Sequence, residues 1–94
     1  MTFTINLNQY IDHTSLLPGT TEAQMHKLCQ EAIKHNFFAV CVNPYHVKHA
    51  VYLLKNSGVS VASVVGFPLG ENSTAIKFSE TLECIENGAT EIDM

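Results

Sequence analysis

A chain of 94 residues has room for a single domain with one hydrophobic core, and we treat residues 1–94 as one unit. Its net charge is −4 and all of its basic side chains are five lysines, so it lacks the basic surface that nucleic-acid binding requires. No segment approaches the roughly 20 consecutive apolar residues of a membrane-spanning helix, which argues against a membrane partner.

The N-terminal third predicts a strand followed by an amphipathic helix. We expect the strand over residues 9–14 and a helix that begins after Thr21, with Gln24 completing a capping box. Apolar residues then recur with the spacing of one buried helix face: Met25, Leu28, Cys29, Ala32 and Ile33. This helix is expected to end near Asn36, because asparagine tolerates the left-handed turn that closes a helix.

The central third repeats the pattern of strand and helix. Residues 37–42 form a continuous apolar run, which is typical of a strand buried on both faces. Asn43 as an N-cap and Pro44 at the first helical position then predict a second helix. Residues 59–65 repeat the buried-strand pattern and lead into the glycine-rich loop 66–70, whose backbone is expected to approach another group closely.

The last third predicts a third helix and a fourth strand. Ser73 or Asn72 can cap this helix. One side of it is predicted to carry the apolar residues Phe78, Leu82, Ile85 and Ala89. The opposite, solvated side is predicted to carry the acidic residues Glu80, Glu83 and Glu86. Residues 91–94 form the fourth strand or its beginning.

Strands that alternate with single helices predict an α/β fold with a parallel sheet, either an open doubly wound sheet or a closed (β/α)8 barrel. The first turn, residues 15–20, is not the G-x-G-x-x-G of a dinucleotide site, and the 66–70 loop lacks the lysine of a P-loop. Barrels place functional groups at the C-terminal ends of their strands, where we expect Asp12, Thr14, Asn43 and Asp93. The sequence therefore favours the N-terminal half, about four βα units, of a (β/α)8 TIM barrel.

Four short motifs, in order and at their spacing, resemble deoxyribose-phosphate aldolase. They are IDHT at 11–14, VCVNP at 40–44, VVGFPLG at 64–70 and EIDM at 91–94, with Lys77 in a T-x-x-K pattern. The resemblance implies a class I aldolase that reversibly cleaves 2-deoxy-D-ribose 5-phosphate to acetaldehyde and D-glyceraldehyde 3-phosphate. It also implies that a lysine amine forms a Schiff base with the substrate, with no metal and no cofactor.

The resemblance also implies roles for five residues. Asp93 matches the aspartate that donates and accepts protons, whereas Asp12, Thr14, Cys41 and Phe67 match residues that line the substrate pocket. From the residues alone, other interpretations stay open. Asp12 could be a structural residue that hydrogen-bonds to the next turn. Cys41 could be a packed strand residue rather than a nucleophile, and Phe67 could belong to the core.

Two departures from the family pattern concern lysines. Leu17 stands where the family usually has a lysine before the proline of its first loop. The family's Schiff-base lysine lies on a later strand, and all five lysines here fall in helix patterns, where solvation keeps an amine protonated. We therefore expect no Schiff-base lysine in this chain and no aldolase activity from it alone.

Half a barrel would leave one sheet face and two strand edges uncovered, so we expect a homodimer or a higher self-assembly. The expected partner of the full-length enzyme is a small sugar phosphate.

The three cysteines form no C-x-x-C pair, which fits reduced thiols in the cytoplasm. His46 and His49 lack a third metal ligand. The alternatives are a self-associating structural half-barrel without catalysis and a small flavodoxin-like ligand-binding domain.

Overall fold

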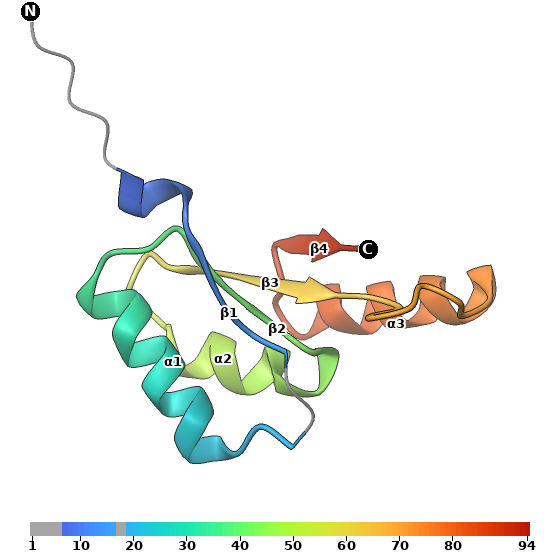
Figure 1. Ribbon diagram of the computed structural model, residues 1–94, viewed down its shortest axis with the longest axis horizontal. Coiled ribbons are helices and arrows are strands. Elements are labelled where there is room, and N and C mark those ends of the chain that lie inside the picture. The colour runs from blue at the N-terminus through green and yellow to red at the C-terminus, as the bar shows by residue number, and fades with distance from the viewer. Residues whose placement is uncertain (1–6, 17–18) are drawn as a thin grey trace, which may run out of the picture.

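The computed structural model describes residues 7–16 and 19–94, so Leu17 lies outside the described residues (Figure 1). Three helices, four short strands and two 3-10 turns (η) alternate along the chain. In order they are η1 (Leu7–Tyr10), β1 (Asp12–Ser15), α1 (Glu22–Lys34), β2 (Ala39–Val42), η2 (Pro44–His46), α2 (Val47–Leu53), β3 (Ser60–Val64), α3 (Thr74–Glu86) and β4 (Glu91–Asp93). No helix among these is long and apolar enough to cross a membrane.

The strands form one parallel sheet in the order β1-β2-β3-β4. Each strand therefore pairs with the next one along the chain, and α1, α2 and α3 lie on the same side of the sheet (Figure 1). A doubly wound, flavodoxin-like sheet needs a reversal of strand order and helices on both faces, and this sheet has neither. The arrangement is that of consecutive βα units of a (β/α)8 barrel, which confirms the predicted fold class.

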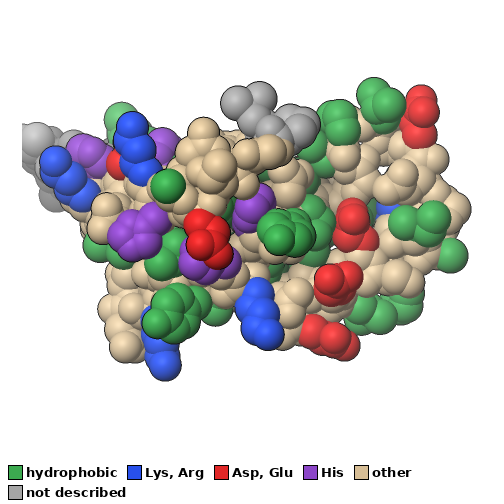
Figure 2. Space-filling view, turned by 90° about the horizontal axis from the view of Figure 1, so that it is seen from below, with side chains coloured by type: hydrophobic (Ala, Val, Ile, Leu, Met, Phe, Trp, Pro, Cys, Tyr) green, Lys and Arg blue, Asp and Glu red, His purple; other side chains and the backbone are tan. Residues whose placement is uncertain are grey.

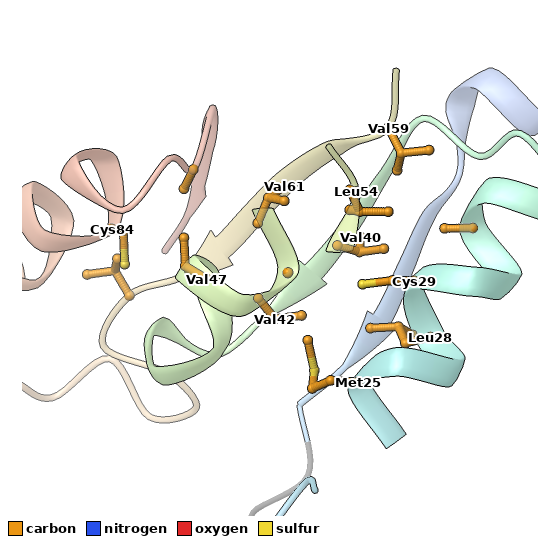
Figure 3. Packing of buried hydrophobic residues seen from close by; sticks show 14 residues of the cluster. Met25, Leu28, Cys29, Val40, Val42, Val47, Leu54, Val59, Val61 and Cys84 are labelled. Atoms are coloured by element: carbon orange, nitrogen blue, oxygen red, sulfur yellow. The ribbon is translucent and has the colours of Figure 1, made fainter. Parts of the chain in front are cut away.

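The hydrophobic core lies between the sheet and the helices (Figure 3). Its buried members are Met25, Leu28, Cys29, Ala32, Val40, Val42, Val47, Ala50, Leu54, Val59, Val61, Val65, Cys84 and Ala89. The strand residues alternate along β2 and β3, because successive side chains of a strand point to opposite faces. Burial raises the pKa of the Cys29 thiol to about 11, so this cysteine is a protonated packing residue at neutral pH.

The capping box predicted for α1 is present. The Gln24 backbone N–H donates to Thr21 Oγ1 at 3.2 Å, and the Thr21 backbone N–H donates to Gln24 Oε1 at 2.8 Å. After the helix, Asn36 takes the left-handed conformation with φ of 54°, as expected for the end of the helix. Ile33, which the spacing placed on the buried face, is 43% exposed, whereas Ala32 beside it is fully buried.

One predicted boundary and one predicted cap were wrong. The first strand begins at Asp12 rather than at residue 9, because residues 7–10 form the 3-10 turn η1. Asn43 holds the N-cap position of η2, but its side chain does not cap that turn. Its amide Nδ2 instead donates to the Leu16 carbonyl oxygen at 3.2 Å, which ties the chain after β1 to the chain after β2.

The burial predicted for the apolar side of the third helix is confirmed for Ala89 and wrong for the other three residues. Phe78, Leu82 and Ile85 are 64%, 45% and 52% exposed, whereas Cys84 is fully buried. The Cys84 thiol donates to Ser63 Oγ at 3.3 Å, so α3 meets the sheet through its Cys84 side. The apolar stripe of α3 consequently faces solvent in the described part of the chain, and we call Phe78, Leu82 and Ile85 the α3 patch.

Candidate functional site

The sheet face without helices carries most of the residues that the motifs single out. The register places Thr14, Cys41, Ala62 and Glu91 in one row across the four strands. Cys41, Ala62 and Val64 form a second buried cluster on this side, packed against the half-buried Leu16 and separate from the core under the helices. We call this surface the open face.

The alternation of side chains along each strand brings further residues to the open face. Asp12 precedes Thr14 by two residues in β1, and Asp93 follows Glu91 by two residues in β4. The two aspartates therefore belong to the rows on either side of the Cys41 row, and Asp12, Thr14 and Asp93 are all exposed. Four of the five candidate residues thus share one face.

Electrostatics supports this grouping. Burial raises the pKa of the Cys41 thiol, and the nearby carboxylates of Asp93, Asp12 and Glu91 raise it further. A protonated thiol is a poor nucleophile, so Cys41 suits a role as a wall of a site rather than as its reactive group. The open face is acidic, with its three carboxylates around an apolar centre.

Asp93 lies at the C-terminal end of β4, as the motif predicted. Its backbone carbonyl accepts a hydrogen bond from the Val65 N–H at 2.9 Å, which fixes the end of β4 against β3. Asp12 lies elsewhere than expected: it starts β1 and pairs with Ala39, the first residue of β2. The prediction that Asp12 lies at a C-terminal strand end was therefore wrong, because η1 delays the start of the strand.

Phe67 lies in the loop between β3 and α3, at the C-terminal edge of the sheet, and is 49% exposed. Gly66, which precedes it, is buried and has a positive φ of 66°. The side chain of Phe67 is therefore neither a core residue nor enclosed by the described residues. The interpretation that Phe67 packs in the core is therefore wrong.

Glu91 is the open-face residue that the motifs did not single out. The signal was present in the sequence: in Glu91-Ile92-Asp93 the period of two places Glu91 on the same face as Asp93. Ile92 correspondingly packs against the core under the helices. All five lysines lie on helices or just after one, and in the described structure no strand carries a lysine.

The helix-covered side of the molecule looks different. Figure 2 shows histidine, lysine and acidic side chains interspersed with apolar ones over this face. An open hollow of about 580 Å³ on this side is lined by residues that include Tyr45, His46, His49 and Tyr52, and none of the candidate residues lines it. Among the described residues there is no group of three or more His, Cys, Asp or Glu side chains that could hold a metal ion.

The sequence was compared with known proteins, and no family model matches it. Over 89 residues it is 57% identical to a deoxyribose-phosphate aldolase of Natranaerobius thermophilus, and the match covers 95% of this chain. The chain is homologous to the N-terminal part of deoxyribose-phosphate aldolases. It spans about 40% of the length of the curated relatives it matches.

Solved structures agree with this assignment. A protein of Coccidioides immitis assigned as a deoxyribose-phosphate aldolase superimposes with a TM-score of 0.92 at 43% identity, covering 95% of this chain and 35% of that one. A deoxyribose-phosphate aldolase of Aeropyrum pernix, described as tetrameric, gives a TM-score of 0.86 at 35% identity and covers 92% of this chain and 37% of that one. The four-stranded unit thus has the fold of part of the α/β barrel of these aldolases, consistent with half a barrel.

Proposed function

We propose that this chain supplies the N-terminal half of a deoxyribose-phosphate aldolase active centre. The complete enzyme would reversibly cleave 2-deoxy-D-ribose 5-phosphate to acetaldehyde and D-glyceraldehyde 3-phosphate. The observation that carries the proposal is the convergence of Asp12, Thr14, Cys41 and Asp93 on the open face. In a closed barrel this face becomes the interior, where barrel enzymes hold their substrates near the C-terminal strand ends.

Each residue has a role that its chemistry allows. In class I aldolase chemistry, a lysine amine adds to the substrate carbonyl and loses water, and the iminium then takes up the electron pair of the breaking carbon–carbon bond. Asp93 is the proton donor and acceptor in this proposal, because its exposed carboxylate can exchange protons through water. Asp12, Thr14, Cys41 and Phe67 line the pocket, and no metal or cofactor takes part.

The imine-forming lysine comes from outside this chain in our proposal. Such a lysine needs a desolvated site that lowers its pKa, and the lysines here lie on helices or just after one rather than on a strand of the described sheet. Lys77, the lysine that the family motif includes, is already engaged, because its Nζ donates to the Gly70 carbonyl oxygen at 2.7 Å.

The reduced state of the three buried, free cysteines supports a cytoplasmic location.

A chimaera tests the proposal. In it, this chain replaces the matched segment of the N. thermophilus aldolase, and cleavage of deoxyribose phosphate is measured through release of acetaldehyde. We expect the chimaera to be active, because the chain supplies the proton-transferring aspartate and the pocket wall. This chain by itself should show neither turnover nor a borohydride-trapped acetaldehyde adduct in its intact mass. An inactive, folded chimaera or an adduct on the isolated chain would contradict the proposal.

A second function, self-association, is favoured by the uncovered surfaces. The open face presents the Cys41, Ala62 and Val64 cluster, and β1 and β4 are strand edges with unpaired backbone groups in the described sheet. The α3 patch adds exposed apolar area. Two four-stranded halves have the number of strands that an eight-stranded barrel needs, so we propose a homodimer or a higher assembly.

Light scattering after size exclusion, at low micromolar protein, should therefore give the mass of a dimer or more. Phe78→Asp should shift the chain toward monomer, since it places a charge in the α3 patch. Tyr52→Asp is the matched control, because Tyr52 is 74% exposed on α2 and lies outside the α3 patch. A well-folded monomer for the unmodified chain, or an equal effect of both variants, would count against this assembly.

A further inference from the structure

The loop that carries Phe67 is bound at both of its ends by α3. The Gly66 N–H donates to Glu80 Oε1 at 2.8 Å, and Lys77 Nζ donates to the Gly70 carbonyl oxygen at 2.7 Å. Within the loop, the Gly70 N–H donates to the Gly66 carbonyl oxygen at 2.6 Å. One helix therefore fixes the point where the loop leaves β3 and the point where it turns toward α3.

The two helix residues act from one side of α3. Lys77 and Glu80 are three residues apart, so they are neighbours on the helix surface, and both are half-buried. Each uses a charged group to bind an uncharged backbone group, and such charge-assisted hydrogen bonds are stronger and shorter than neutral ones. The sequence pattern placed Glu80 on the solvated acidic side with Glu83 and Glu86. That prediction was wrong for Glu80, because its partner is a loop amide 14 residues earlier in the chain.

Packing reinforces the hydrogen bonds. A Cβ atom at Gly66 would lie 3.1 Å from Lys77 Cε and 3.5 Å from Lys77 Cγ, so the lysine stem lies directly over the glycine. The positive φ of Gly66 also disfavours any side chain there. Lys77 thus has two functions at once: its methylenes cover the start of the loop and its ammonium group holds the end of it.

We propose that Lys77 and Glu80 are positioning residues that set the place of Phe67 at the rim of the substrate site. This inference rests on the proposed pocket role of Phe67. The hydrogen bonds of the two side chains go to the backbone of the 66–70 loop and not to a candidate site residue. Since Phe67 offers an apolar wall and no proton, a loosened loop should weaken substrate binding more than the chemical step.

Hydrogen exchange on the isolated chain tests the local part of the proposal. In Lys77→Met, which keeps most of the stem and removes the donor, and in Glu80→Ala, amide exchange in the 66–70 loop should become about tenfold faster. Lys55→Met and Glu83→Ala are matched controls, since both residues are exposed, and they should leave the loop unchanged. Exchange in β2, residues 39–42, reports whether each variant still folds. Unchanged loop exchange in a folded Lys77→Met or Glu80→Ala variant would overturn the proposal.

Kinetics in the chimaera with the N. thermophilus aldolase test the functional part. Lys77→Met and Glu80→Ala should raise the KM for deoxyribose phosphate about three- to tenfold and change kcat by less. Glu80→Gln should stay close to the unmodified chimaera, because glutamine keeps the Oε1 acceptor for the Gly66 N–H. A fall in kcat without a change in KM, or a failure of glutamine to rescue, would overturn the positioning role. An inactive unmodified chimaera would instead overturn the proposed function, and loop exchange would then decide the inference by itself.

Discussion

Asp93→Asn in the chimaera should lower kcat for deoxyribose-phosphate cleavage by about 10²–10⁴-fold, the range expected when a general acid–base is lost. Asparagine has nearly the same shape and leaves the β4 backbone bond to Val65 intact, so the fold should not change. The loss should appear mainly in kcat, because Asp93 is proposed to move a proton rather than to bind substrate. Steady-state kinetics together with an unchanged thermal midpoint would establish this.

Glu91→Gln is the matched control for Asp93→Asn. Glu91 lies on the same strand and the same open face, two residues earlier, and its charge also acts on Cys41. If negative charge on this face were all that mattered, both variants would lose similar activity. We expect Glu91→Gln to keep kcat within about tenfold of the parent, well short of the loss that proton transfer predicts. Equal losses would refute the specific role of Asp93.

Met25→Ala should produce the largest loss of stability among single substitutions in the core, about 2–5 kcal/mol in the free energy of unfolding. Met25 is fully buried in α1, on the side that faces β2, near Val42 (Figure 3). Removing its side chain loses the burial of the thioether and leaves a cavity between helix and sheet. Total stabilities of small domains are only about 5–15 kcal/mol, so this variant is expected to unfold at a much lower urea concentration.

Ile33→Ala provides the comparison, because it removes a similar volume from the same helix at a position that is 43% exposed. Its effect on the free energy of unfolding should stay near or below about 1 kcal/mol. Urea titrations of both variants measure the difference in the free energy of unfolding, provided that the dependence of this free energy on urea concentration is the same for both. Similar losses for the two would mean that the core under α1 is packed less tightly than its burial indicates.

The open face connects these results to function. Its carboxylates surround an apolar centre, and the described strands offer no cation to compensate them. Whatever completes the barrel must therefore bring positive groups or accept unpaired negative charge in its interior. This requirement agrees with the proposal that the imine-forming lysine is supplied from outside this chain, and it makes closure by two identical halves electrostatically less favourable than closure by a complementary half.

The order of strands and helices was predictable because its signals are local. The capping box of Thr21 and Gln24 involves residues within one helical turn, and the buried runs before Asn43 and Gly66 need no knowledge of their partners. The period of two along β4 was also a usable local signal, although Glu91 was not predicted from it as a residue on the face of Asp93. Local periodicity does not say, however, which helix face a neighbour covers, so the burial of Phe78, Leu82 and Ile85 was predicted wrongly.

By itself, the sequence determined the α/β class, the family resemblance and the five candidate residues, which are Asp12, Thr14, Cys41, Phe67 and Asp93. Only the tertiary structure decided that all of these except Phe67 share one face, and that Glu80 and Lys77 hold the Phe67 loop. The physical reason is distance along the chain. Register across β1 to β4 joins residues from both ends of the chain, and the partner of Glu80 is 14 residues away. Such contacts arise when the whole sheet and its helices pack together, so they cannot be predicted from a short segment of the sequence.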